Sequence, residues 1–143
     1  MQVRPGFQDL VEYCRRNDIE FRVVSNGLKF YIRAILKSIG MDSLDVFAAE
    51  SEFSPTGMRV WFSGPDGNEL KACFKEAYTR YFLGQGYRVA YIGDGASDCL
   101  PARETQYIFA RDALLDYCRE QKLQCTPFED FYAVLRKLEG IRG

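Results

Sequence analysis

The chain has 143 residues, which is the size of one domain with a single hydrophobic core. Its 19 lysines and arginines nearly balance its 20 aspartates and glutamates, so the formal net charge is −1. This balance argues against a strongly basic face, and we expect neither a nucleic-acid partner nor membrane binding. No run approaches about 18 uncharged apolar residues, and the first ten residues do not resemble a signal peptide. We therefore expect a cytoplasmic protein.

The chain contains no histidine. Within these residues, Ser-His-Asp catalysis, Cys-His catalysis and zinc sites built on imidazole are excluded. The cysteine count is odd and no Cys-x-x-Cys motif occurs, which indicates reduced thiols rather than a disulfide scaffold or a zinc ribbon. These cysteines are Cys14, Cys73, Cys99, Cys118 and Cys125. Hydrolytic chemistry would have to use carboxylates, lysine, backbone amides and a hard metal ion.

In chain order, helical spacing of apolar residues comes first and predicts a helix over residues 5–17. Ile19–Val24 is rich in β-branched and apolar residues, which is typical of a buried strand. The segment Ser25-Asn26-Gly27 is a turn signal that should end this strand. A second helix is predicted over residues 28–39, with Gly40 as its stop signal.

The middle of the chain predicts a β-hairpin followed by a helix. Two apolar runs, Leu44–Ala49 and Met58–Phe62, flank the turn signal at 54–57. A Gly-Pro-Asp-Gly loop follows at 64–67. Asn68 is then expected to cap a helix over residues 69–83.

Residues 87–92 predict a second buried strand that leads into Gly93–Asp98 and a short helix. Tyr107–Ala110 predicts a third strand, and residues 111–121 predict a helix. The segment 126–129 reads as a capping box that starts a last helix ending near Gly140. This alternation predicts an α/β fold: a Rossmann-like parallel sheet with helices on both faces, plus the hairpin, as a single domain over residues 1–143.

In such sheets ligands bind beyond the carboxyl ends of the strands, where two polar turns lie in this sequence. The turn after the second strand, Gly-Asp-Gly-Ala-Ser-Asp, places Asp94 and Asp98 four residues apart. Two carboxylates on one loop suit Mg²⁺, a hard cation that prefers oxygen ligands. The alternative is a glycine turn whose aspartates cap the following helix.

Ser25, Asn26 and Gly27 offer a hydroxyl and free amides at a helix start, which can bind an anion or simply cap the helix. Lys75 lies within the predicted helix beside apolar Phe74, and Lys71 is a competing cation one turn earlier. On local pattern alone, Lys75 is equally an ordinary surface lysine.

The order of these three signals resembles the haloacid dehalogenase superfamily of phosphohydrolases, from its second motif onward. The segments RPGFQDLVEY, FRVVSNGLKFYI, GDGASD and FARDALLDYCREQ resemble in particular the phosphatases of methionine salvage, and phosphoserine phosphatases are close relatives. The resemblance covers about residues 4–137. It implies a hydrolase with a HAD-like core that uses Mg²⁺ and acts on a small phosphorylated metabolite.

The resemblance also implies roles for individual residues. Ser25 would hydrogen-bond a phosphoryl oxygen, helped by the amides of Asn26 and Gly27. Lys75, preferred to Lys71 because its spacing to Gly93 fits the family, would neutralise charge on the phosphoryl group. Asp94 would ligate Mg²⁺ directly. Asp98 would act nearby, through a metal-bound water or by fixing Lys75.

One departure from the family is serious. Its first motif, Asp-x-Asp-Gly-Thr, supplies the nucleophile, and no Asp-x-Asp occurs in these 143 residues. The first strand and the cap of the family are therefore expected to be missing, and the exposed sheet edges to favour self-association. The alternative is a non-catalytic fragment that binds phosphate or a partner. A nucleotide-binding module would need a Gly-x-Gly-x-x-Gly or related loop, which does not occur.

Overall fold

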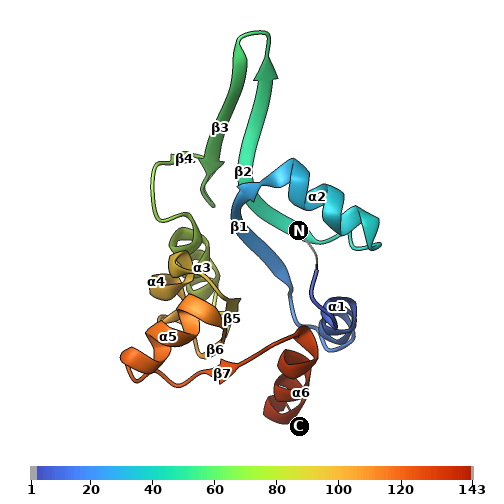
Figure 1. The fold of residues 1–143 in the computed structure, drawn as a ribbon, viewed down its shortest axis with the longest axis vertical. Coiled ribbons are helices and arrows are strands. Elements are labelled where there is room, and N and C mark those ends of the chain that lie inside the picture. The colour runs from blue at the N-terminus through green and yellow to red at the C-terminus, as the bar shows by residue number, and fades with distance from the viewer. Residues whose placement is uncertain (1–2, 143) are drawn as a thin grey trace. The chain divides into compact units, whose positions relative to one another are not determined.

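The computed structural model describes residues 3–142, which form two compact units (Figure 1). The first unit contains residues 20–78, and the second contains residues 3–19 together with residues 79–142. The predicted α/β class, with parallel strand pairs and a β-hairpin, is confirmed. The strands belong to two sheets, one in each unit. The expectation of one domain over residues 1–143 stays a prediction.

The first unit is built on a four-stranded sheet with the order β1-β2-β3-β4. β1 pairs parallel to β2, whereas β2, β3 and β4 are antiparallel neighbours. Helix α2 makes the connection between the two parallel strands, and α3 begins in this unit. The bounds are β1 Arg22–Leu28, α2 Lys29–Ser38, β2 Asp45–Ser54, β3 Gly57–Ser63, β4 Glu69–Leu70 and α3 Phe74–Gly84.

The predicted hairpin is confirmed: β2 and β3 form a long ribbon, coloured green in Figure 1. The helix expected over residues 69–83 is wrong at its start, because α3 begins at Phe74. Asn68 does not cap it; the Asn68 amide N–H instead donates to the Asp66 carboxylate at 3.0 Å. This turn returns the chain beside β3, so Glu69 and Leu70 pair with Ser63 and Phe62. The hydrogen bonds from Asn68 hold the pKa of Asp66 below its ordinary value.

The segment Ser25-Asn26-Gly27, expected as a turn, lies within β1. The strand extends to Leu28, but its register with β2 shifts between Val24 and Leu28. The sequence signal therefore marks an irregular end of the strand rather than a separate turn. Helix α2 follows at once and ends as expected, since Gly40 has a φ of 75° and its N–H donates to the Lys37 carbonyl.

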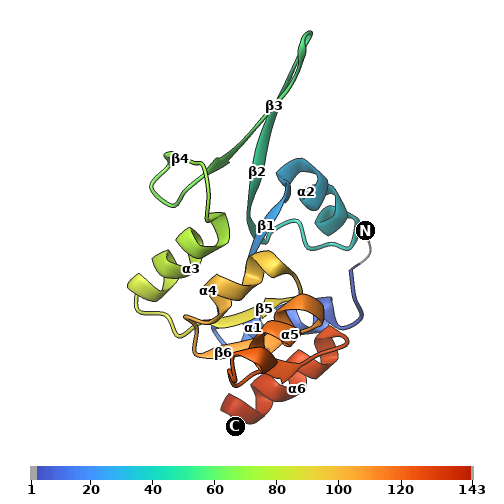
Figure 2. The ribbon, with the colours of Figure 1, turned by 60° about the vertical axis from the view of Figure 1, so that its left-hand side comes forward.

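The second unit is built on a three-stranded parallel sheet, β5-β6-β7. Helices α4 and α5 pack beside its strands (Figure 2). Its most deeply buried side chains include Leu10, Phe109, Leu114 and Val134. The bounds are α1 Phe7–Arg16, β5 Ala90–Gly93, the 3-10 helix η1 Ala96–Asp98, α4 Cys99–Ala102, β6 Tyr107–Ala110, α5 Asp112–Glu120, β7 Thr126–Pro127 and α6 Phe131–Arg142.

The start of the last helix is a second correction. Thr126 and Pro127 form β7 beside Phe109 and Ala110, so the capping box expected at 126–129 does not start a helix. Helix α6 begins at Phe131, after Asp130, whose carboxylate accepts a hydrogen bond from the Ala133 N–H at 3.2 Å. The helix therefore begins about one turn later than the sequence predicts, and Asp130 rather than Thr126 accepts the capping hydrogen bond.

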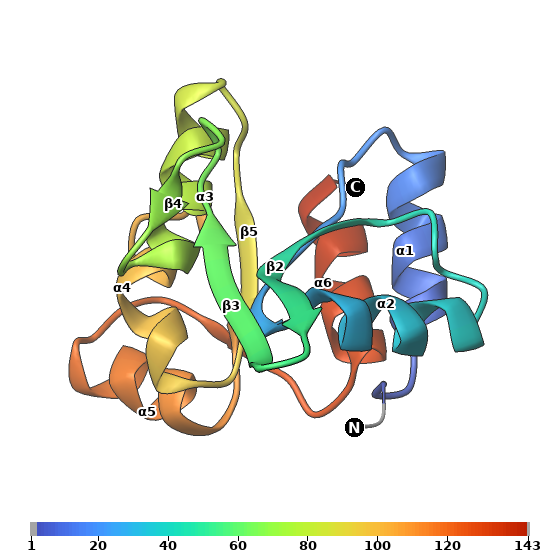
Figure 3. The same ribbon diagram turned by 90° about the horizontal axis from the view of Figure 1, so that it is seen from above.

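Helices α1 and α6 lie side by side (Figures 1 and 3). The rings of Phe7 and Phe131 meet edge to face with centroids 5.3 Å apart, and the Phe131 N–H donates to the Pro5 carbonyl. Gly6 precedes α1 with a φ of 90°, and a Cβ at this position would lie 2.6 Å from the Tyr132 backbone nitrogen. Only glycine fits this close approach without rearrangement.

Strands β1 and β5 each lie at one end of their own sheet within residues 3–142. They are the strands that lead to the two predicted site segments. The expected self-association through sheet edges stays a prediction. Among the described helices, none combines the length and apolar character needed to cross a bilayer.

Three thiols pack in the core of the second unit, and their burial predicts how they react. Cys118 is fully buried among Leu114 and Ala110, with Cys99 and Cys125 packed against that cluster. Burial raises the pKa of the Cys118 thiol to about 11, with Cys125 contributing.

At pH 8 a thiol with this pKa is almost entirely protonated, and the thiolate is the reactive form. We expect iodoacetamide to modify exposed Cys73 at least about 100-fold faster than Cys118 in the folded chain. Peptide mass spectrometry over a time course measures both rates, and denaturant provides the control, since unfolding should equalise them. Equal rates in the native chain would contradict the buried position of Cys118.

Candidate active site

The loop after β5 carries the two acidic candidates in very different environments. Asp94 follows the last residue of the strand directly and is exposed. Asp98 ends η1 and is only 4% exposed, although it carries a carboxylate. A carboxylate so deeply buried requires partners for its oxygens. The two aspartates therefore cannot be interchangeable.

Asp98 accepts hydrogen bonds from β5 and from the loop itself. The Tyr91 hydroxyl donates to Oδ1 at 2.6 Å, and the amides of Asp94 and Gly95 donate to Oδ2 at 3.1 Å and 2.9 Å. Hydrogen bonds to an ionised acceptor are stronger than neutral ones. The carboxylate of Asp98 thus fixes the backbone from which the Asp94 side chain projects.

Gly93 allows this arrangement because it has no side chain. A Cβ at Gly93 would lie 2.6 Å from both Cγ and Oδ2 of Asp98, closer than real side chains approach one another. The backbone of Asp94 is held on its other side as well, since its carbonyl accepts a hydrogen bond from the Leu114 N–H at 3.4 Å. The loop is therefore tied to α5 as well as to its own buried carboxylate.

This loop fits part of a magnesium site. Exposed Asp94 offers an oxygen ligand of the kind Mg²⁺ prefers, while the oxygens of Asp98 are already engaged by the protein. In the portion of the chain from Val3 to Arg142, no group of three or more acidic, cysteine or histidine side chains is arranged to hold a metal ion. Among the described residues of this loop, one carboxylate, that of Asp94, is therefore placed to bind a metal ion directly.

Ser25 is half-buried, and its Oγ accepts a hydrogen bond from the Gly27 N–H at 3.0 Å. This contact uses the oxygen of the hydroxyl and leaves its O–H to donate elsewhere. Asn26 and Gly27 are exposed. A donating hydroxyl beside exposed backbone is suited to an anionic oxygen, which is the chemistry expected of this segment.

Sequence reasoning missed the ion pair that lies just beyond this segment. Lys29, the first residue of α2, pairs with Glu50 of β2, and both side chains are largely buried. A lysine four residues after Ser25 was the available signal, but its partner lies 21 residues away and no local pattern shows it. Because Glu50 neutralises Lys29, this cation is less available to a ligand than its position suggests.

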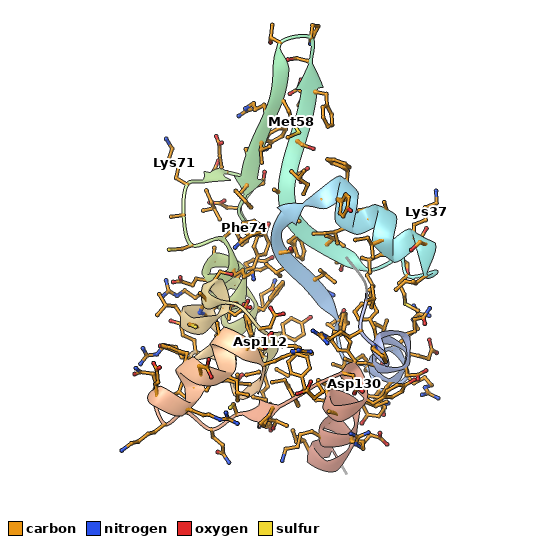
Figure 4. The ribbon with its side chains drawn as sticks, viewed as in Figure 1. Lys37, Met58, Lys71, Phe74, Asp112 and Asp130 are labelled. Atoms are coloured by element: carbon orange, nitrogen blue, oxygen red, sulfur yellow. The ribbon has the colours of Figure 1, made fainter. Side chains whose placement is uncertain are left out.

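Lys75 is in the first turn of α3, not in the middle of a helix as expected. Its side chain is half-buried, whereas Lys71 lies before the helix and is exposed. Figure 4 shows Lys71 on the segment between β4 and α3. Ser25, Asn26, Gly27 and Lys75 belong to the first unit, and Asp94 and Asp98 belong to the second. Their convergence on one cleft stays a prediction.

Arg111 is a further polar residue at the carboxyl end of the second sheet. It follows β6 directly, and its backbone N–H donates to the Gly93 carbonyl at 3.2 Å. Its guanidinium donates to the Glu129 carbonyl at 2.9 Å and lies over the Phe128 ring. Arg111 therefore joins the ends of β5, β6 and β7. The motif FARDALLDYCREQ contains it, but sequence reasoning gave it no role.

Residues 1–102 match the family of haloacid dehalogenase-like hydrolases. The chain belongs to this family. The expected superfamily is thus confirmed, whereas the roles of the individual site residues stay predictions.

Curated relatives point to one branch of the haloacid dehalogenase-like family. The chain is 31% identical to the 2-hydroxy-3-keto-5-methylthiopentenyl-1-phosphate phosphatase of Exiguobacterium sibiricum, over 96% of this chain and 64% of the relative. Proteins of the same name from Brevibacillus brevis and Bacillus velezensis are 30% and 31% identical, over 98% of this chain and 64% and 61% of theirs. The chain therefore spans less than two thirds of the length of these relatives.

Proposed function

We propose that this chain supplies the phosphate and metal side of a Mg²⁺-dependent phosphomonoester hydrolase. The substrate is a small phosphorylated metabolite, and the names of the relatives indicate 2-hydroxy-3-keto-5-methylthiopentenyl-1-phosphate. The observation that carries the proposal is the buried Asp98 carboxylate, which holds the amides of Asp94 and Gly95 and leaves the Asp94 side chain exposed at a strand end. A loop fixed in this way is prepared for a ligand before the ligand arrives.

Each candidate residue has a distinct task in this proposal. Asp94 binds the metal ion directly. Asp98 is a positioning residue, and it would contact the metal ion only through a bound water molecule. The Ser25 hydroxyl donates to a phosphoryl oxygen beside the amide of Asn26, the Gly27 amide holds the Ser25 Oγ, and Lys75 neutralises phosphoryl charge. Mg²⁺, when bound, adds positive charge beside the transferring group, which is the main requirement of phosphoryl transfer.

One group that the proposed reaction needs, the carboxylate nucleophile, is not found in these residues. No Asp-x-Asp occurs in the 143 residues, so these residues do not contain the nucleophile motif that the resemblance implies. Ser25 cannot replace it, because a serine nucleophile needs a neighbouring base, whereas the Ser25 Oγ accepts a hydrogen bond from the Gly27 amide. The second candidate function, favoured by the same observation, is binding of phosphate or a partner without turnover.

Magnesium binding tests the metal part of the proposal. We expect the 143-residue chain to bind Mg²⁺ weakly, with a dissociation constant on the order of millimolar, because one direct carboxylate replaces only one of about six waters. Asp94→Asn should abolish this binding in isothermal titration calorimetry. Asp116→Asn, an exposed aspartate on α5, is the matched control and should leave it unchanged. Equal binding by both variants would remove Asp94 from the site.

Turnover separates the two candidate functions. We expect the 143-residue chain alone to hydrolyse p-nitrophenyl phosphate with Mg²⁺ no faster than about 10⁻³ per second, because the covalent step lacks its nucleophile. Turnover near one per second that Asp94→Asn abolishes would refute the non-catalytic alternative. It would also show that another carboxylate, such as Asp66 or Glu69, completes the site.

A further inference from the structure

The β2–β3 hairpin presents an apolar surface to solvent. Four large side chains, three on the hairpin and one at the start of α2, remain exposed: Phe53 by 69%, Met58 by 47%, Val60 by 44% and, on α2, Phe30 by 48%. We call these four residues the hairpin patch. Figure 4 shows Met58 on the hairpin, beyond the point where α2 accompanies β2. Large apolar side chains gathered in this way usually mark an interaction site.

The strand register places the hairpin members of the patch on one face. Phe53 pairs with Met58, and Ser51 pairs with Val60, so these side chains project to the same side of the ribbon. Phe30 at the start of α2 extends this face, since its ring meets that of Phe53 edge to face at 5.8 Å. The four residues therefore form one continuous surface within the first unit.

The opposite face of the same hairpin is charged. It carries Glu50 and Glu52 on β2 and Arg59 on β3. Arg59 lies 4.5 Å from the Trp61 ring centroid and pairs with Glu69 at 3.8 Å. Polar and apolar residues are thus sorted between the two faces, as in a sheet with one face in water and one face covered. Within the first unit, the members of the hairpin patch remain 44–69% exposed on this apolar face.

We propose that the hairpin patch binds a second copy of this chain, packed face to face about a two-fold axis. The patch carries no formal charge, so two copies meet there without like-charge repulsion, whereas the opposite face would bring glutamates together. Four large side chains about half exposed offer roughly 400 Å² of apolar surface. A standard interface buries about 800 Å² per partner, of which somewhat more than half is apolar. The patch supplies most of the apolar share.

This interface is independent of the proposed function and differs from pairing at the free sheet edges. The edge pairing expected from the sequence would use the backbone of β1 or β5, and no residue of the patch belongs to either strand. A closed two-fold contact also limits assembly to a dimer, whereas edge pairing can continue. The two modes therefore predict different masses and different sensitive residues.

The test is the mass of the 143-residue chain in solution, measured by sedimentation velocity from 1 to 100 μM. We expect a dimer with a dissociation constant of about 10 μM or lower. Phe53→Glu should weaken dimerisation at least 100-fold. Glu52→Gln is the matched control, since it changes the adjacent residue on the opposite face, and it should leave the dissociation constant within about two-fold.

Further variants keep the proposal falsifiable. Met58→Glu should weaken dimerisation as Phe53→Glu does, and it replaces Phe53→Glu as the test if circular dichroism shows that Phe53→Glu does not fold. Leu100→Glu alters an exposed apolar residue in the second unit and should leave the dimer intact. A chain that stays monomeric at 100 μM, or a dimer that survives both patch variants, would overturn the proposal. Loss of the dimer with Leu100→Glu as well would show unspecific association and would also overturn it.

Discussion

Replacing Gly93 with alanine is expected to lower the free energy of unfolding by about 3 kcal/mol. The new Cβ would lie 2.6 Å from the Asp98 carboxylate, which cannot withdraw without losing its bonds from Tyr91, Asp94 and Gly95. Losing even one or two bonds to a buried charged acceptor costs on the order of 1.5–3 kcal/mol each. Urea unfolding followed by circular dichroism measures the change.

Gly95→Ala is the matched control for this prediction. Gly95 has an extended backbone with a φ of −107°, and its nearest contact for a new Cβ is ordinary, 3.6 Å from Asp98 Oδ2. We expect a change within about 0.5 kcal/mol. If Gly93→Ala and Gly95→Ala had the same small effect, the close approach of Gly93 to Asp98 would not matter for stability. The proposed role of Asp98 as the residue that fixes the loop would then fail.

The second large effect is expected at Gly6, where alanine should cost about 3 kcal/mol of unfolding free energy. Two penalties combine: the left-handed backbone at a φ of 90° disfavours a side chain by about 1–2 kcal/mol, and the new Cβ would lie 2.6 Å from the Tyr132 nitrogen. The clash is with backbone, which cannot rotate away. Helices α1 and α6 would have to separate.

Gly40→Ala distinguishes the two penalties. Gly40 shares the left-handed backbone, with a φ of 75°, but a Cβ there would meet nothing within 4 Å. It should cost only the backbone part, about 1 kcal/mol. The difference between the two variants, measured in the same urea titrations, reports the packing of α1 against α6. Equal losses would indicate that this packing tolerates a methyl group.

Much of the fold was predictable because its local signals agree with its packing. The apolar spacing of Phe7, Leu10, Val11 and Cys14 predicts α1, and all four side chains are buried. The hairpin follows from two apolar runs around a turn signal. Gly40 ends α2 with the positive φ that the sequence pattern indicates. In these segments, local preference and tertiary contacts favour the same structure.

The errors have a common cause, since each segment makes a contact distant in sequence. Glu69 and Leu70 were expected to start a helix, yet they pair with β3 because the Asp66 turn directs the chain back. Thr126 and Pro127 have the pattern of a cap, yet they pair with β6. Short strands of two residues depend entirely on their partners, and no periodicity can develop over such a length.

For the candidate site, residue type was predictable and environment was not. The sequence shows two aspartates four residues apart on one loop, but it does not show that Asp98 is buried and Asp94 exposed. The deciding contact comes from Tyr91, which precedes the loop as a member of the strand. Likewise, Lys75 was recognised, but its place in the first turn of α3 depended on the unexpected strand before it.

The packing of α1 on α6 has a consequence for synthesis. The Pro5 carbonyl accepts its hydrogen bond from Phe131, so α1 can make this contact only after residue 131 has been synthesised. The four strands of the first sheet all lie between residues 22 and 70, so this sheet can begin to form while later segments are still being added, whereas the contact of α1 with α6 must wait for residue 131. Until then the apolar face of Phe7 and Leu10 is uncovered on a nascent chain. That interval is when chaperone binding would matter most, and a stop codon before residue 131 would make it permanent.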